Sequence, residues 1–66
     1  MDEYVIRTEH AAGEFWLCFH HSGAKSATAD RDQAARMSAP VAYLMKLELD
    51  RQDVGTTDFT RHIEKL

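Results

Sequence analysis

Two β-favouring runs on either side of a short loop constrain the fold of this chain more than any other feature of its sequence. Residues 4–9 are rich in β-branched and aromatic side chains, and residues 14–21 carry an unbroken apolar stretch from Phe15 to Phe19. The loop between them ends at Gly13, as hairpin loops commonly do. An unbroken apolar run is typical of a strand that is covered on much of both faces. The pattern therefore predicts a β-hairpin.

The size of the chain limits it to one small domain, residues 1–66. A domain this short buries only about 60% of the surface that its unfolded chain exposes, so the core is thin. Its single cysteine, Cys18, excludes an intramolecular disulfide, and we therefore expect a reducing, cytoplasmic setting. No apolar run approaches the ~18 to 20 residues of a membrane span and no signal peptide opens the chain, so we expect no membrane association.

The segment after the hairpin predicts a loop and then a short helix. Residues 22–29 are rich in Ser, Gly, Ala and Thr, as loops are. Thr28 or Asp30 can cap the following helix, because its side-chain oxygen can accept a hydrogen bond from a free N–H of the first turn. We expect this helix over residues 31–38 and its end before Pro40, since proline disfavours helical geometry at the residue before it.

Residues 41–50 have a composition that suits a helix, but their spacing predicts a strand. The apolar side chains fall two residues apart, at Val41, Tyr43, Met45, Leu47 and Leu49. On a helix, Val41, Tyr43 and Leu47 would lie on widely separated faces. On a strand all five would line one face of a sheet, so the pairing register would be well specified.

Residues 58–66 fit two structures. Phe59, Ile63 and Leu66 lie at i, i+4 and i+7, which predicts an amphipathic helix. Every second residue from 57 to 63 also suits one face of a fourth strand: these are Thr57, Phe59, Arg61 and Ile63. The helix is the favoured interpretation.

Together these segments predict an α+β domain of ββαβ order. It has a three-stranded antiparallel sheet with the first strand central, one helix packed on the sheet and a short C-terminal helix. The predicted core is Ile6, Phe15, Leu17, Phe19, Ala34, Met37, Val41, Tyr43, Met45, Leu47 and Leu49. The opposite sheet face is expected to show Arg7, Glu9, Trp16, Cys18, Lys46 and Glu48.

The residue types needed for metal binding or catalysis are present, but their spacing is not that of a known site. Cys18 and His20 lie two apart and would project from one face of a strand, which could serve zinc, and His21 follows directly. No C-x-x-C or H-x-x-x-H spacing accompanies them. Ser22 has neither a glycine-flanked elbow nor a phosphate-binding loop around it. We therefore expect no enzyme, no catalytic residues and no cofactor, with metal binding at Cys18, His20 and His21 left open.

The charge balance argues against a protein that holds nucleic acid by neutralising phosphates. The chain has 8 Lys and Arg against 11 Asp and Glu, a net charge of -3, whereas such proteins usually carry a basic excess. Trp16 with Tyr4 or Arg7 could still form a stacking platform, as in single-stranded RNA binders. A small nucleic-acid-binding or regulatory module that uses the sheet face around Trp16 is therefore the alternative function. The other interpretation of Trp16 is that it packs under the terminal helix through Phe59 and Ile63.

The order of the predicted elements resembles a group of small proteins encoded by phages and mobile elements. The segments that carry the resemblance are Tyr4-Val5-Ile6-Arg7, Phe15-Trp16-Leu17-Cys18, Asp32-Gln33-Ala34-Ala35-Arg36-Met37 and Val41-Ala42-Tyr43-Leu44. Several anti-CRISPR proteins are similar in size and in ββαβ order. The resemblance implies a stoichiometric inhibitor that acts in the host cytoplasm. Such an inhibitor would bind a subunit of a CRISPR effector complex and block target-DNA binding or nuclease recruitment. Anti-CRISPR proteins share no common motif, so no residue role is carried over.

The side chains that such an inhibitor would use are selected by general rules for protein interfaces. Trp, Tyr and Arg dominate binding hot spots, and spaced carboxylates steer a protein onto a basic partner. The predicted contact residues are Tyr4, Arg7, Trp16, Glu48, Asp50, Arg51 and Asp53. The open edges of a three-stranded sheet and its small core also allow a homodimer.

Overall fold

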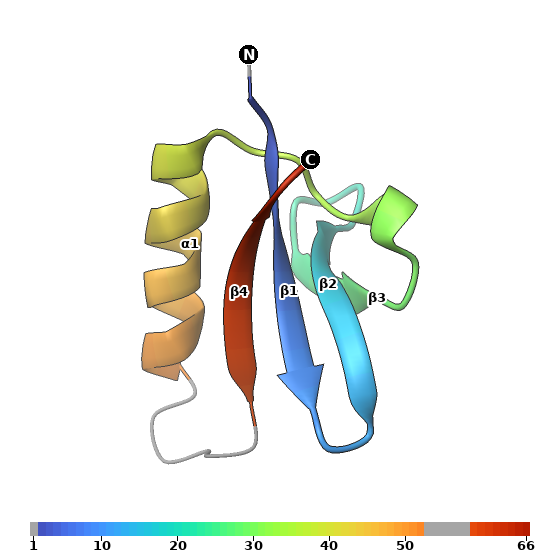
Figure 1. Cartoon of the computed structure of the whole chain (residues 1–66). Coiled ribbons are helices and arrows are strands. Elements are labelled where there is room, and N and C mark those ends of the chain that lie inside the picture. Colours follow the sequence, from blue (N-terminus) through green and yellow to red (C-terminus); the bar gives the residue numbers. More distant parts are fainter. Residues whose placement is uncertain (1, 53–58) are drawn as a thin grey trace.

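The computed structural model describes residues 2–52 and 59–66, which form a small α+β domain. The elements follow in the order β1 (Tyr4–His10), β2 (Gly13–Phe19), β3 (Lys25–Thr28), a single 3-10 turn (Arg31–Gln33), α1 (Ala39–Gln52) and β4 (Thr60–Lys65). The described strands form one antiparallel sheet in the order β3-β2-β1-β4, with α1 as a separate layer (Figure 1). The prediction of an antiparallel α+β domain is confirmed. The sheet has four strands rather than three, and the described residues contain no C-terminal helix.

The predicted hairpin is confirmed. β1 and β2 pair in antiparallel register, with Thr8 opposite Phe15 and His10 opposite Gly13. Gly13 has a φ of +138°, a conformation that glycine adopts without the steric penalty of a side chain. β1 lies between β2 and β4, so the prediction that the first strand is central is also confirmed.

The predicted strand over residues 41–50 is wrong, because these residues belong to α1. Its sheet-facing side carries Ala42, Met45, Lys46 and Leu49, which lie at i, i+3, i+4 and i+7 and are buried or half-buried. Residues such as Ala, Leu, Met, Lys and Glu have high helix propensity, and here that propensity prevails over the alternating pattern. The role predicted for Pro40 was also wrong: it lies in the first turn of α1, where its missing N–H has no intrahelical partner to lose.

The predicted helix over residues 31–38 is reduced to the turn Arg31–Gln33. Asp30 caps this turn as predicted, since its side chain accepts a hydrogen bond of 3.0 Å from the N–H of Asp32. The chain then runs extended along the sheet, where Met37 exchanges two backbone hydrogen bonds with Tyr4, of 2.7 and 2.9 Å. A helix of eight residues is marginal in water, so these backbone hydrogen bonds to the sheet prevail over it.

Two of the four strands lie where the sequence predicted other structures. β3 falls within the predicted loop of residues 22–29, because Lys25–Thr28 pairs with the edge of β2 although it lacks an alternating apolar pattern. β4 replaces the favoured terminal helix and matches the alternative that alternation suggested. Ile63 pairs with Ile6 and Arg61 with Thr8, so β4 satisfies the edge of β1 that would otherwise be open.

The core lies on both sides of β1. Ile6 and Leu17 are buried on the face toward α1, and Val5, Trp16 and Ala34 form a buried cluster on the opposite face. The prediction of Ile6, Leu17 and Ala34 as core residues is therefore confirmed. Half-buried members of the predicted core are Phe15, Met37, Met45 and Leu49, and exposed members are Phe19, Val41, Tyr43 and Leu47. Val41, Tyr43 and Leu47 are exposed because the helix turns them away from the sheet.

The face opposite α1 agrees only partly with its prediction. Arg7 lies opposite Trp16 and Glu9 opposite Glu14, so the sheet residues are placed on the expected face. Lys46 and Glu48 are not part of this face, because they belong to α1. Trp16 is buried there by Ala34, which the extended segment after the 3-10 turn supplies.

We expect the loss of one methylene group from a buried side chain of β1 to destabilise the protein more than the loss of most of an exposed side chain on the outside of α1. Ile6 is fully buried, so Ile6→Val should lower the free energy of unfolding by about 0.5–1.5 kcal/mol. Leu44 is 65% exposed, so Leu44→Ala should change it by less than about 0.5 kcal/mol. Urea unfolding followed by circular dichroism measures both values. The reverse ranking would contradict the assignment of the two faces of α1.

Candidate functional site

The side of α1 that points away from the sheet carries large apolar residues. We call this surface the α1 outer face, and it consists of Val41, Tyr43, Leu44 and Leu47. Their exposed fractions are 47, 58, 65 and 44%, respectively. Leu44 lies three residues from both Val41 and Leu47, and Tyr43 lies four residues from Leu47. These spacings bring the four side chains together on the helix surface. The outer face is therefore a continuous apolar surface on a regular helix.

The origin of this exposed surface is the apolar character of α1 on more than one side. The sheet-facing side buries Ala42 and partly buries Leu49, so the packing of the domain is already satisfied by that side. A helix that packs on one layer normally shows polar residues to solvent. Contiguous exposed apolar patches on small proteins mark interaction sites more often than single exposed residues do.

Three of the predicted contact residues are brought together on the same helix. Glu48 accepts a hydrogen bond of 2.6 Å from the Lys25 ammonium, which ties α1 to β3. Asp50 accepts hydrogen bonds from Lys46 at 2.8 Å and from Arg61 at 3.1 Å. Arg51 is exposed in the last turn. Asp53 lies outside the described residues.

Two neighbouring cations, Lys46 and Arg61, keep the carboxyl group of Asp50 ionised. Burial raises the pKa of this carboxyl, but the hydrogen bonds from Lys46 and Arg61 outweigh burial, so its pKa lies below the usual 3.8. Asp50 is therefore ionised at neutral pH and paired with two cations. Paired charges of this kind fix the helix to β4 and contribute less to long-range steering than unpaired ones do.

The other predicted contact residues lie in the sheet, apart from the outer face. Tyr4 is half-buried at the end of β1, where it pairs with Met37. Arg7 donates hydrogen bonds to Glu9, to Glu14 at 3.1 Å and to Glu64 at 3.0 Å. These contacts lie on the face opposite α1. The structure therefore divides the predicted contact residues between the sheet and α1.

Trp16 is buried rather than displayed. It is 8% exposed, it packs against Ala34, and its indole N–H lies 3.4 Å from a Glu64 oxygen. The packing partner that the sequence suggested, Phe59, instead lies against the rings of His10 and Phe15, at centroid distances of 4.8 and 6.4 Å. A stacking platform around Trp16 would require the segment that carries Ala34 to move away.

The cluster around Arg7 lowers the pKa of two carboxyl groups. For Glu9 the main cause is its hydrogen bond with Arg7, which lowers the pKa against the opposing effect of burial. For Glu64 burial raises the pKa, but the hydrogen bonds from Trp16 and Arg7 together lower it below the usual 4.5. The hydrogen bonds that Arg7 donates, first to Glu9 and then to Glu14 and Glu64, raise its pKa against the opposing effect of burial. Arg7, Glu9 and Glu64 are therefore charged at neutral pH.

The residues considered for metal binding, Cys18, His20 and His21, do not form a metal-binding cluster within the described parts of the chain. No group of three or more His, Cys, Asp or Glu side chains there could hold a metal ion. Cys18 is a free, half-buried thiol in β2, and His20, His21 and Ser22 follow it in an exposed turn. Across residues 2–52 and 59–66, the helices are too short and too polar to cross a membrane.

The outer face of α1 was missed because its members were assigned elsewhere. Val41, Tyr43 and Leu47 were predicted to line the core, and Leu44 was given no role. The high helix propensity of this segment and the position of Pro40 at its start were the signals for a helix. Read as a helix, the segment has apolar residues at all angles, which predicts an exposed apolar surface.

Comparisons with protein families, with curated proteins and with solved structures give no match to this chain. The functional argument therefore depends on the geometry described above.

The lowered pKa values predict how stability depends on pH. Glu9 and Glu64 take up protons more readily in the unfolded chain than in the folded one. Their contribution to the free energy of unfolding is therefore complete well above pH 4.5 and is lost as pH falls below that value. Glu64→Gln should flatten the loss of stability between neutral and acidic pH. Glu3→Gln, which alters an exposed carboxyl with no ion pair among the described residues, is the matched control.

Thermal unfolding at a series of pH values measures this effect. If Glu64→Gln and Glu3→Gln gave the same pH profile as the wild type, the Arg7 cluster would not contribute to stability in the way that its geometry requires.

Proposed function

We propose that this protein is a non-enzymatic protein-binding module that inserts the α1 outer face into an apolar groove of its partner. The observation that carries the proposal is the exposure of Tyr43, Leu44 and Leu47 on a helix that the sheet has already anchored by its other side. Docking of an amphipathic helix into a groove is a common mode of peptide and protein recognition. Anchors three and four residues apart, as here, are the pattern that this mode uses.

The energetics define what the partner must supply. Full burial of a large apolar side chain contributes about 1.5–3 kcal/mol, so covering the exposed part of each outer-face residue contributes roughly 1 kcal/mol. Four such residues give roughly 4 kcal/mol, while association alone costs an estimated 4–15 kcal/mol. The partner therefore has to bury a comparable apolar area of its own. Glu48 and Arg51, of opposite charge, lie beside the outer face and fit the polar rim of such an interface.

The anti-CRISPR resemblance is a separate hypothesis about the identity of the partner. It drew on a ββαβ order in which residues 41–44 were a strand, and these residues lie in α1 instead. The element order therefore gives the resemblance no support. A subunit of a CRISPR effector complex stays a prediction that binding experiments can test, with block of target-DNA binding or of nuclease recruitment as its expected effect.

The alternative function, a nucleic-acid-binding module built around Trp16, is less well supported by the geometry. The burial of Trp16 and the engagement of Arg7 with three glutamates leave neither side chain presented for stacking on bases. We therefore place the proposed protein interface on α1.

We expect two polar substitutions on the outer face to weaken partner binding without unfolding the protein. Leu44→Ser with Leu47→Ser removes about 2 kcal/mol of apolar contact, which corresponds to roughly a 30-fold loss of affinity. Leu66→Ser is the matched control, since Leu66 and Leu47 are each 44% exposed and Leu66 lies outside α1. Circular dichroism checks that all variants keep the fold.

The binding assay uses purified CRISPR effector complexes, and sedimentation of the protein alone tests the predicted homodimer. The proposal is supported if the wild type and Leu66→Ser bind a partner, or form a dimer, with equal affinity and the double variant does so roughly 30-fold more weakly. Equal binding by all three proteins would contradict it. If no effector complex binds and phage immunity is unaffected in a plaque assay, the effector is excluded as the partner.

A further inference from the structure

A short extended segment bonds to two strands that would otherwise pair with each other. We call residues 34–37 the strap, which follows the 3-10 turn and crosses the sheet toward α1 (Figure 1). The pairing of β1 with β2 ends at Arg7 opposite Trp16, although β1 begins at Tyr4 and β2 continues to Phe19. The hairpin is therefore open at one end, and the strap lies in that gap.

The strap is joined to both strands by backbone hydrogen bonds. The Ala35 N–H donates to the Leu17 carbonyl of β2 at 2.8 Å. The Tyr4 N–H of β1 donates to the Met37 carbonyl at 2.7 Å, and the Met37 N–H donates to the Tyr4 carbonyl at 2.9 Å. These three bonds occupy groups that β1 and β2 offer to each other.

The ladder between β1 and β4 shows which way the backbone groups of β1 point. In an antiparallel ladder, residues that bond to one neighbouring strand alternate with residues whose N–H and C=O point to the other side. The Leu66 N–H donates to the Glu3 carbonyl at 2.9 Å, in register with the β1–β4 ladder. Alternate residues of β1, Tyr4 and Ile6, therefore present their N–H and C=O to β2.

The same argument applies to β2. The His20 N–H donates to the Ala24 carbonyl at 2.9 Å, in register with the β2–β3 ladder. Leu17 and Phe19 therefore present their backbone groups away from β3 and toward β1. The groups on the two sides of the gap face each other.

Without the strap, β1 and β2 could complete their ladder. In the register that they already have, the next pairs of this kind are Ile6 opposite Leu17 and Tyr4 opposite Phe19. Each such pair exchanges two hydrogen bonds, so two pairs give four, against the three that the strap forms. Release of the strap therefore causes no net loss of backbone hydrogen bonds.

Side-chain packing holds the strap in place. Ala34 is 7% exposed and forms a buried cluster with Val5 and Trp16 on the face opposite α1. Ala34 contributes a single methyl group to this cluster, while the burial of Trp16 makes the closed arrangement the major one. The balance between the two arrangements thus depends on one small contact over a large aromatic ring.

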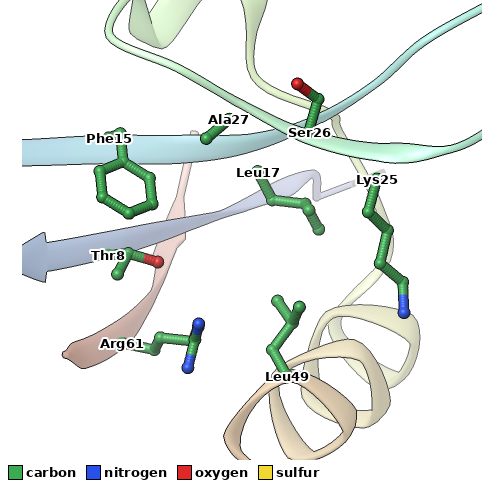
Figure 2. Close-up of a pocket in the computed structure, with 8 residues that line it drawn as sticks. All are labelled: Thr8, Phe15, Leu17, Lys25, Ser26, Ala27, Leu49 and Arg61. Carbon is green, nitrogen blue, oxygen red and sulfur yellow. The ribbon is translucent and has the colours of Figure 1, made fainter. Parts of the chain in front are cut away.

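The other face of the sheet carries a cavity of about 270 Å³ beside Thr8, between Leu17 of β2 and Leu49 of α1 (Figure 2). The cations that line it, Lys25 and Arg61, are already paired with carboxylates of α1. The cavity therefore selects no particular ligand, and the strap packs on the opposite face of the sheet.

We propose that the strap is a detachable cover that controls access to Trp16. In the closed arrangement, Ala34 covers the indole ring. In the open arrangement the strap leaves the gap, β1 and β2 complete their ladder, and Trp16 becomes exposed on the face that also carries Arg7. This is the movement that a binding surface around Trp16 requires. The proposal does not depend on the α1 outer face, which belongs to the helix on the other side of the sheet.

Ala35→Pro tests the proposal through the exchange of amide hydrogens with solvent in the full chain. The substitution removes the N–H that bonds to Leu17, and Ala34 already has a ψ of 144°, which suits a residue before proline. Because the closed arrangement loses one hydrogen bond, we expect the Met37 amide to exchange roughly fivefold faster. The Arg7 amide, which points toward β4, should stay within about twofold of its wild-type exchange rate.

Arg36→Pro is the matched control. The Arg36 N–H takes part in none of the three bonds, so the exchange of the Met37 amide should stay within about twofold of the wild type. An unchanged Met37 amide in Ala35→Pro would overturn the proposal. Equal acceleration of the Met37 and Arg7 amides would also overturn it, because exchange would then report unfolding of the whole domain.

Ala34→Asp is a second test, which holds the strap open. Burial of a carboxylate against Val5 and Trp16 is strongly unfavourable, so the closed arrangement is lost. We expect circular dichroism to show a folded protein and the emission of its single tryptophan to shift to the red. We also expect an Hα–Hα nuclear Overhauser contact between Val5 and Cys18, which the completed ladder places opposite each other. Ala29→Asp, at an exposed position before the strap, is the matched control and should keep the wild-type emission.

An unfolded Ala34→Asp protein would overturn the proposal, because the strap would then be an essential part of the core. A folded variant with unchanged tryptophan emission would overturn it as well, since Trp16 would still be covered. Neither result would affect the proposed protein interface, because that interface is tested at Leu44 and Leu47.

Discussion

The structure depends on the burial of both faces of the central strand. Val5 and Ile6 are consecutive residues of β1, so their side chains point to opposite faces, and neither is exposed to solvent. A chain of 66 residues must therefore supply two separate elements, one to pack on each face of the sheet. The helix α1 covers the face of Ile6, and the extended segment that carries Ala34 covers the face of Val5. The position of each remaining element follows from this division.

A short chain that covers two faces leaves apolar surface uncovered. α1 packs over β1 and β4, so its far side stays exposed and the part of the sheet over β2 and β3 stays open. The exposed side carries Tyr43 and Leu44, and the open part of the sheet carries the cavity beside Thr8. The exposed helix face and the cavity are therefore consequences of the same packing arrangement. Larger domains bury a greater fraction of their surface and can cover such regions with further elements.

Local sequence patterns predicted the elements that local interactions determine. The hairpin and the cap at Asp30 follow from nearby residues, and both are confirmed. The central position of β1 is also confirmed, although it depends on pairing with the distant β4. β3 has no apolar alternation, and the pattern of β4 fits both a helix, which was favoured, and a strand. Pairing of these segments with β2 and β1 therefore decided their structure. The segment of α1 was mistaken for a strand because its exposed apolar residues, read together with its buried ones, produce an alternating pattern.

The candidate sites were only partly accessible from the sequence for the same reason. Glu48, Asp50 and Arg51 were selected for their charge and lie on the helix beside the outer face, whereas Tyr43 and Leu47 were assigned to the core. Trp16 was selected as an aromatic contact, but the covering of the second sheet face buries it. The cavity beside Thr8 depends on where α1 stops covering the sheet. That is a property of the packed structure, and no short segment of the sequence encodes it.

The central claim is that residues 39–52 form a helix with Ala42 against the sheet and Leu44 toward solvent. A solution NMR measurement of the full chain tests it directly, through secondary chemical shifts and nuclear Overhauser contacts. The account predicts helical Cα and Cβ shifts throughout residues 41–50 and contacts from the Ala42 methyl group to β1 or β4, with none from Leu44 to the sheet. Extended shifts over these residues, with Val41, Tyr43, Met45, Leu47 and Leu49 all in contact with a neighbouring strand, would contradict it.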